Sequence, residues 1–206
     1  MRVLIACEFS GIVRDAFIAA GHDAMSCDLL PSERLGPHYT GDVCELILND
    51  EWDMMIAHPP CTYLANSGVS WLGRQDSRRE KMIEAALFFK FLLNAEIPKI
   101  AVENPVMHGY AVEIIGRKQD QTIQPYEFGH PESKRTGLWL VNLPLLKPTN
   151  VLTKPERGYW DNQTPSGQNK IGPSETRWME RSRFYTGWAT AMAEQWGGYA
   201  AQQEGQ

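Results

Sequence analysis

A cysteine and a glutamate each follow a short apolar run that predicts a buried strand. Cys61 comes after the run 54–57 and two prolines, which stop the strand and stiffen the turn. Glu103 comes directly after the run 99–102. If the two strands lie parallel in one sheet, both side chains reach its carboxyl edge, where α/β proteins place ligand chemistry. A thiol and a carboxyl group at one edge indicate covalent attack by sulfur on an electrophile that the acid assists.

One reaction that needs this pair is methylation of a pyrimidine ring at C5, which is a poor nucleophile by itself. Addition of a thiolate at C6 makes C5 enamine-like, so that C5 can take a methyl group from an electrophilic donor. A glutamate with a raised pKa suits the task of protonating N3, and a basic side chain near O2 would stabilise the developing negative charge. The alternative for Cys61 is a small buried hydrophobic residue without a chemical role.

The N-terminal part of the chain predicts a cofactor-binding unit. A strand over 2–7, a turn with Gly11, a helix over about 12–20 and a strand over 23–27 lead to Asp28. An acid at the end of the second strand can accept hydrogen bonds from ribose hydroxyls. The glycine pattern GxGxxG of dinucleotide sites is absent, so a ligand with ribose and adenine but without phosphates fits better. S-adenosylmethionine (SAM) is the obvious candidate.

The rest of the chain continues the alternation of strands and helices. Asp42 either bonds the adenine amino group or caps the short helix that follows it. The segment from about 144 to 173 is rich in Pro, Gly, Asn and Lys and predicts an irregular excursion, and the residues from about 186 to 196 predict a C-terminal helix. We therefore expect one α/β domain, residues 1–206, with a mostly parallel central sheet and helices on both faces.

The composition limits the class of protein. Hydrophobic residues make up 43% and charged residues 22%, as in globular proteins, and no run of about 18 apolar residues predicts a membrane span. The first apolar run is too short for a signal peptide, so we expect a cytoplasmic protein with no membrane partner. The four cysteines form no CxxC pair, which predicts no metal site. A net charge of −5 and a pI of about 5.6 argue against a broad basic surface for DNA, leaving 74–79 and 132–135 as local basic patches.

The motifs resemble, in their order, those of the DNA cytosine-5 methyltransferase family. The matching segments cover about residues 2–140 and 183–196. They are Phe9-Ser10-Gly11 for the SAM-binding turn, Asp28 for the ribose, Gly41-Asp42-Val43 near the adenine, Pro59-Pro60-Cys61 for the nucleophile, Glu103-Asn104-Pro105 for its acid, Phe128 to Thr136 for the basic motif, and Thr186-Gly187-Trp188-Ala189 for the segment that returns to the SAM pocket.

This resemblance implies a Rossmann-like SAM-dependent methyltransferase domain in which Cys61 and Glu103 are catalytic. The residues that it implies for cofactor binding are Phe9, Ser10, Gly11, Asp28, Asp42, Pro59, Thr186 and Gly187. Two departures concern the SAM turn, where Val13 replaces the second glycine, and the basic motif, where Lys134 and Arg135 stand in place of Gln-x-Arg-x-Arg. Neighbouring residues of a strand point to opposite faces, so either Lys134 or Arg135 reaches the base.

The family carries a large target-recognition domain, for which only about residues 141–182 are present here. We therefore expect cytosine-5 methylation of duplex or single-stranded DNA, with little sequence specificity or with help from a homodimer mate or a partner protein. Such a compact enzyme would suit a restriction-modification system or a phage. Two alternatives are methylation of a free nucleotide such as dCMP, and a catalytically silent SAM- or DNA-binding protein with the same fold.

Overall fold

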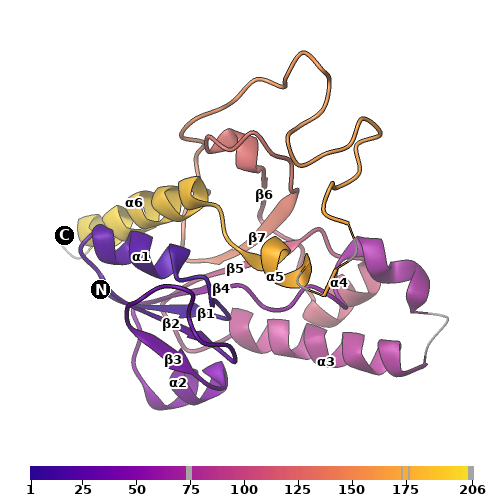
Figure 1. Ribbon diagram of the computed structural model, residues 1–206. Helices are drawn as coiled ribbons and strands as arrows, with labels where there is room; N and C mark the ends of the chain where they lie inside the picture. Colours follow the sequence, from indigo (N-terminus) through magenta and orange to yellow (C-terminus); the bar gives the residue numbers. More distant parts are fainter. Residues whose placement is uncertain (73–75, 173, 176, 204–206) are drawn as a thin grey trace.

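The computed structural model describes residues 1–72, 76–172, 174–175 and 177–203 (Figure 1). The strands are β1 (Arg2–Ala6), β2 (Asp23–Asp28), β3 (His38–Thr40), β4 (Met54–Ala57), β5 (Lys99–Pro105), β6 (Gln121–Ile123) and β7 (Thr136–Val141). The α-helices are α1 (Ile12–Ala19), α2 (Val43–Asn49), α3 (Asp76–Leu93), α4 (Gly109–Ile115), α5 (Arg177–Ser182) and α6 (Thr186–Gln203), and two 3₁₀ helices are η1 (Asn66–Trp71) and η2 (Pro125–Glu127).

The strands of the described chain form one 7-stranded sheet in the order β3-β2-β1-β4-β5-β7-β6. Strands β1 to β5 are parallel, while β7 runs antiparallel to β5 and β6 runs antiparallel to β7. The order reverses between β1 and β4, which is the position where open α/β sheets leave a crevice for ligands. The predicted α/β fold with a mostly parallel sheet is therefore confirmed.

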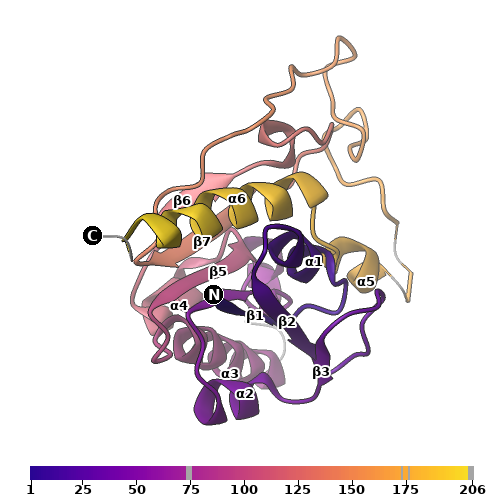
Figure 2. The same ribbon diagram turned by 90° about the vertical axis from the view of Figure 1, so that its left-hand side faces the viewer.

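Helices cover both faces of the sheet because its strands are apolar on both sides. In β1, Val3 and Ile5 pack with residues of α1 and α6, while Leu4 and Ala6 pack with residues of α2, α3 and α4. Figure 2 shows α1 and α6 side by side on one face and α3 on the other. On the α3 face, Trp139 of β7 meets Phe89 edge-on at 4.9 Å between ring centroids. This two-sided core fixes the positions of the strand ends.

The region between β7 and α6 differs in two respects from the expectation. A short helix, α5, precedes α6, and α6 itself extends beyond residue 196. The excursion from about 144 to 173 rises above the sheet (Figure 1), and residue 173 lies outside the described residues. Its described part contains no helix or strand, but Trp160 is buried and stacks on Tyr126 at 4.7 Å between ring centroids. None of the helices in the described residues has the length and apolar character of a membrane span.

Candidate active site

The two predicted reactive turns lie next to each other at the carboxyl edge of the sheet. Strands β4 and β5 are parallel neighbours, and Ala57 pairs with Val102. His58 directly follows β4 and lies beside Glu103, and Cys61 follows His58 by three residues. Strand β5 continues to Pro105, so Glu103 lies within the strand and not after it as predicted. The negative charge of Glu103 acts on the thiol of Cys61. The structure thus brings together the two groups that the sequence assigns to catalysis.

The chain after Glu103 holds the loop that carries Cys61. The Asn104 amide Nδ2 donates a hydrogen bond to the carbonyl of Pro59 at 2.8 Å. Further along, His108 Nδ1 accepts from the backbone N–H of Ala111 at 3.2 Å, so its Nε2 carries a proton and donates to the carbonyl of Tyr63 at 3.0 Å. The loop is fixed on both sides of the cysteine, which preorganises the thiol.

Glu103 and His58 form a buried pair. His58 Nδ1 lies 3.4 Å from Glu103 Oε2, and their side chains are 9% and 10% exposed. Burial raises the pKa of Glu103, but the hydrogen bond from His58 and the positive charges of Lys134 and His58 outweigh it, so the pKa lies below its ordinary value of 4.5. The expectation of a raised pKa is therefore wrong, because it left out these two basic neighbours.

Cys61 is a thiol rather than a thiolate in the free protein. Burial raises the pKa of Cys61, and the charge of Glu103 raises it further. The positive charges of Lys134 and Arg181 oppose this shift without cancelling it. A nucleophile with these surroundings needs additional activation when the substrate binds.

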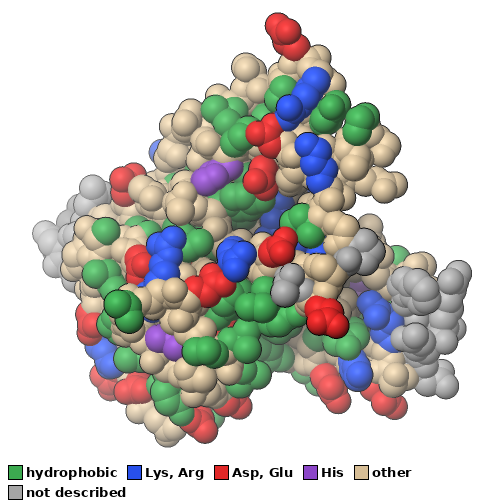
Figure 3. Space-filling model, in the orientation of Figure 1, with side chains coloured by type: hydrophobic (Ala, Val, Ile, Leu, Met, Phe, Trp, Pro, Cys, Tyr) green, Lys and Arg blue, Asp and Glu red, His purple; other side chains and the backbone are tan. Residues whose placement is uncertain are grey.

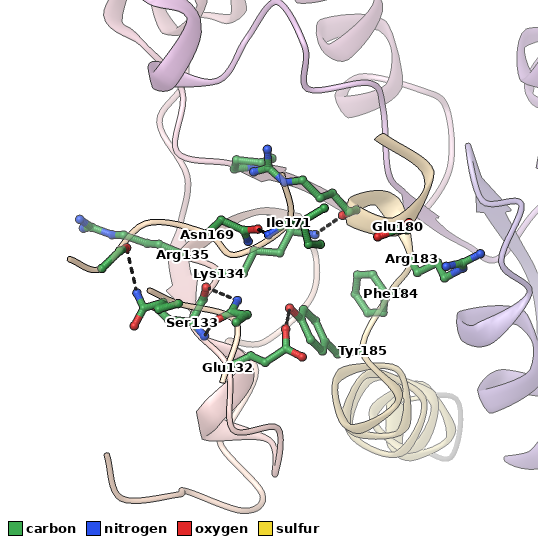
Figure 4. Close-up of a pocket in the computed structure, with 15 residues that line it drawn as sticks. Glu132, Ser133, Lys134, Arg135, Asn169, Ile171, Glu180, Arg183, Phe184 and Tyr185 are labelled. Carbon is green, nitrogen blue, oxygen red and sulfur yellow. Dashed lines mark hydrogen bonds between the residues drawn. The ribbon is translucent and has the colours of Figure 1, made fainter. Parts of the chain in front are cut away.

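Lys134, and not Arg135, faces these groups. The Lys134 ammonium donates a hydrogen bond to the carbonyl of Arg181 at 3.1 Å, and its charge lowers the pKa of both Cys61 and Glu103. Arg135 is exposed, and its side chain points away from the other labelled residues in Figure 4. The two residues directly precede β7 and alternate in direction, as neighbouring residues of an extended chain do.

A cavity of about 430 Å³ lies between the start of β7, the excursion and the segment around α5 (Figure 4). Its basic lining residues are Lys134, Arg135, Arg181 and Arg183, and Asn162, Gln163 and Asn169 line it from the excursion. Lys and Arg side chains are visible in the hollow beneath the excursion in Figure 3. Pro105, two residues after Glu103, also lines the cavity, so the cavity adjoins the reactive edge.

The turn after β1 closes the N-terminus of α1 with its own carboxylate. Buried Glu8 accepts hydrogen bonds from Ser10 Oγ at 2.9 Å and from the backbone N–H groups of Val13 at 2.8 Å and Arg14 at 3.3 Å. Gly11, the N-cap residue, has a φ of +69° that favours glycine. Because a carboxylate already occupies the helix N-terminus, a phosphate would be repelled there. A phosphate-free, positively charged cofactor fits these residues.

Phe9, Asp28 and Asp42 lie at this same edge. Phe9 is buried, and its ring lies 6.4 Å from that of Trp178 in α5. Asp28 ends β2, its Oδ1 accepts from the N–H of Leu30 at 3.0 Å, and burial raises its pKa. Asp42 is the N-cap of α2, where its Oδ1 accepts from the N–H of Cys44 at 2.9 Å. The capping alternative for Asp42 is thus present in the structure.

Thr186 and Gly187 begin α6 and contact a different region. The N–H of Gly187 donates to His130 Nε2 at 2.9 Å, and a Cβ at this glycine would lie 2.0 Å from the carbonyl oxygen of Phe128. The turn after β1, residues 7–10, which we call the cofactor turn, instead lies beside residues just before α6. Those that line a small hollow together with the turn and His58 are Ser182 and Phe184.

From the sequence alone we assign no role to Glu8, His58, Asn104 or Arg181. Asn104 stands in the Glu-Asn-Pro motif, and His58 directly precedes the two prolines, so position in a motif was the available signal for both. Glu8 and Arg181 carry no such signal. Their contacts arise from the path of the turn after β1 and from the placement of α5.

Comparisons with known proteins identify solved structures only. No family model matches the chain, and no curated protein matches it. A structure titled as a DNA modification methyltransferase encoded within an E. coli prophage shares 15% identity at a TM-score of 0.47, covering 74% of this chain and 52% of that one. The Entamoeba histolytica methyltransferase EhMeth shares 15% at 0.47, covering 74% and 57%. The S. pombe Dnmt2 methyltransferase shares 18% at 0.42, covering 70% and 51%. The chain spans about half the length of these proteins.

Proposed function

We propose that this protein is a SAM-dependent methyltransferase that transfers a methyl group to C5 of cytosine in DNA. The observation that carries the proposal is the cluster of Cys61, Glu103 and Lys134 at one edge of the sheet, beside a cavity. A thiol, a buried carboxyl group and a nearby cation are the three groups that C6 addition to a pyrimidine needs.

In the first step the sulfur of Cys61 bonds to C6, and N3 of the ring takes up a proton on the side of Glu103. Glu103 Oε1 is buried and has no hydrogen-bond partner, so it is available to face N3. Lys134 favours the thiolate of Cys61 and stabilises negative charge on the ring. After C5 has gained the methyl group, it loses its hydrogen as a proton, the sulfur–C6 bond breaks to return the thiolate, and N3 gives its proton back to Glu103.

SAM would supply the electrophilic methyl group, which it carries on a positively charged sulfur. The residues that we propose to hold it are Phe9, Ser10, Gly11, Asp28, Asp42 and Pro59. Thr186 and Gly187 belong to this set by the resemblance alone, because Gly187 contacts His130 and Phe128. The half-buried carboxylate of Asp28 suits the ribose hydroxyls. Glu8, which closes the helix N-terminus, adds negative charge near the turn and favours a cationic ligand.

DNA leads as substrate because of the family resemblance, and a free nucleotide such as dCMP is the second candidate. Asn162, Gln163 and Asn169 of the excursion line one side of the cavity. Because the excursion partly encloses the cavity, this arrangement favours a small substrate. A silent binding protein is the third candidate, and it gives no reason for Cys61 and Glu103 to lie together at one edge.

A tritiated-methyl transfer assay with duplex DNA, single-stranded DNA and dCMP separates these candidates. We expect transfer by the wild-type protein, loss of transfer in Cys61→Ser, and retained transfer in the matched control Cys44→Ser. Transfer that survives Cys61→Ser would show that the mechanism is not covalent. SAM binding without transfer to any of the three substrates would establish the binding protein instead.

A further inference from the structure

His58 is a buried side chain for which the reaction above has no use. Its ring packs against Phe184 at 4.6 Å between ring centroids, and its backbone N–H donates to the carbonyl of Ala6 at 2.9 Å. One ring nitrogen, Nδ1, lies 3.4 Å from Glu103 Oε2. The other, Nε2, is buried and has no hydrogen-bond partner, and the residue lines the hollow beside the cofactor turn. An unsatisfied buried nitrogen is costly, so its retention calls for an explanation.

The proposed first step requires an acid that gives a proton to N3. Glu103 by itself cannot give one, because its lowered pKa makes it a carboxylate at neutral pH. A carboxylate can only accept hydrogen bonds, so Nδ1 of His58 carries the proton shared by the pair. Lys134 directs its ammonium to the carbonyl of Arg181. Among the described residues, His58 is the side chain hydrogen-bonded to Glu103. The distance of 3.4 Å is long, as catalytic hydrogen bonds often are before the substrate binds.

We propose that His58 and Glu103 form a proton-holding pair, in which His58 supplies the proton that Glu103 delivers to N3 of the pyrimidine. This inference rests on the proposed function. His58 acts through Glu103 and is a positioning residue rather than a catalytic one.

The protons and charges balance in this step. Cys61 first gives its thiol proton to solvent. As the resulting thiolate bonds to C6, a His58 ring that carries protons on both nitrogens passes its Nδ1 proton to Glu103, and Glu103 passes it to N3. A carboxyl group turns readily about its Cγ–Cδ bond, so the oxygen that gains the proton can present it to the ring. The thiolate charge and the imidazolium charge disappear together, leaving neutral adduct, neutral imidazole with its proton on Nε2, and the carboxylate.

Other charged and titratable groups surround the pair and stay unchanged in the variants below. They are Cys7 and Glu8 after β1, Cys61 after β4, Lys134 before β7, Arg181 in α5, and Tyr185 before α6.

The first test is the pH dependence of single-turnover methyl transfer. His58→Asn keeps an N–H donor toward Glu103 but has no proton to give, and His22→Asn makes the same chemical change at the amino end of β2. We expect His58→Asn to lower the rate about 100-fold at pH 7. The thiolate fraction of Cys61 enters every rate equally, so the readout is the ratio to the wild-type rate. This ratio should recover by up to about tenfold per pH unit for His58→Asn as pH falls and Glu103 itself becomes protonated, while the ratio for His22→Asn stays flat. A His58→Asn rate within threefold of the wild type, with the same profile, would overturn the proposal.

The second test does not depend on activity. ¹⁵N NMR of histidine-labelled protein, assigned by the signals lost in His58→Asn, reports which ring nitrogen bears a proton. A proton on Nδ1 at neutral pH supports the pair, and a bare Nδ1 refutes it. If the wild type transfers no methyl group to any substrate, the proposed function fails, while this spectrum still decides whether His58 holds the shared proton.

Discussion

The two sides of the sheet's carboxyl edge satisfy their buried polar groups in different ways. On the side of the turn after β1, the carboxylate of Glu8 accepts three hydrogen bonds, and the fully buried guanidinium of Arg14 donates to side chains and carbonyls around it. On the side of β4 and β5, three buried atoms among the described residues lack partners: His58 Nε2, Glu103 Oε1 and Asn104 Oδ1.

This difference separates residues that stabilise the fold from residues that await a ligand. A buried polar atom without a partner costs about 1–3 kcal/mol, which a chain tolerates where a substrate later supplies the missing bond. The Glu8 and Arg14 network is complete without a ligand, and the network around Glu103 is not. Substitutions on the two sides should therefore affect different properties, and each prediction below tests that division.

Glu103→Gln should have the largest effect, and on activity. The amide cannot deliver a proton, so we expect methyl transfer to fall about 10²–10⁴-fold, measured as the single-turnover rate at saturating substrate. The division between the two sides fails if Glu103→Gln keeps more than about a tenth of the wild-type rate.

The same variant has a defined effect on acid stability. The pKa of Glu103 is lowered in the folded state, so its ionisation stabilises the fold above pH 4.5, and this contribution is lost as pH falls through the folded pKa. The unfolding free energy of Glu103→Gln should therefore fall less steeply than that of the wild type below pH 4.5, as measured by urea titration. An equally steep fall would show that folding does not lower the pKa of Glu103.

Arg14→Met should have the next largest effect, and on stability. Arg14 is 0% exposed, and it joins Asp15 to the loop after β2 through the carbonyls of Arg34 and Leu35. Its removal takes the donor from the buried Ser26 hydroxyl and disconnects α1 from this loop, so we expect the unfolding free energy to fall by about 1–3 kcal/mol. Arg34→Met is the matched control, because that side chain is 46% exposed and pairs with the same Asp15. A loss in the control above about 1 kcal/mol would contradict the assignment.

The sequence was sufficient for the features that depend on pattern and strand order. Apolar runs followed by Cys61 and Glu103 predicted two strands that, if parallel in one sheet, bring both groups to its carboxyl edge, and the structure pairs these strands through Ala57 and Val102. The side of Lys134 was not predictable, because one residue of strand register decides it. The contact of Glu8 with the N-terminus of α1 could not be predicted for a related reason. Glu8 reaches the helix because the chain turns through positive φ at Cys7 and Gly11. Such contacts depend on the path of the backbone.

Asn104 contributes both to the fold and to the position of the reactive loop, so Asn104→Ala should affect both stability and activity. It removes the 2.8 Å hydrogen bond to the carbonyl of Pro59, so we expect a loss of about 1–2 kcal/mol in unfolding free energy. Because this bond positions the Cys61 loop, methyl transfer should also fall, by about tenfold or more. Asn94→Ala removes an exposed amide-to-carbonyl bond and is the control for stability. A stable Asn104→Ala protein with full activity would show that the loop is held by other contacts.

Lys134→Gln should have the smallest effect, and it decides which basic residue serves the nucleophile. The charge of Lys134 lowers the pKa of Cys61, so its removal should raise that pKa and reduce the thiolate fraction. We expect alkylation of Cys61 by iodoacetamide at neutral pH to slow by up to about tenfold, followed by mass spectrometry of the Cys61 peptide. Arg135→Gln is the matched control, since that exposed side chain points away, and it should alkylate at the wild-type rate. Equal slowing in both variants would mean that the effect is one of net charge alone, and Lys134 would lose its place beside the thiol.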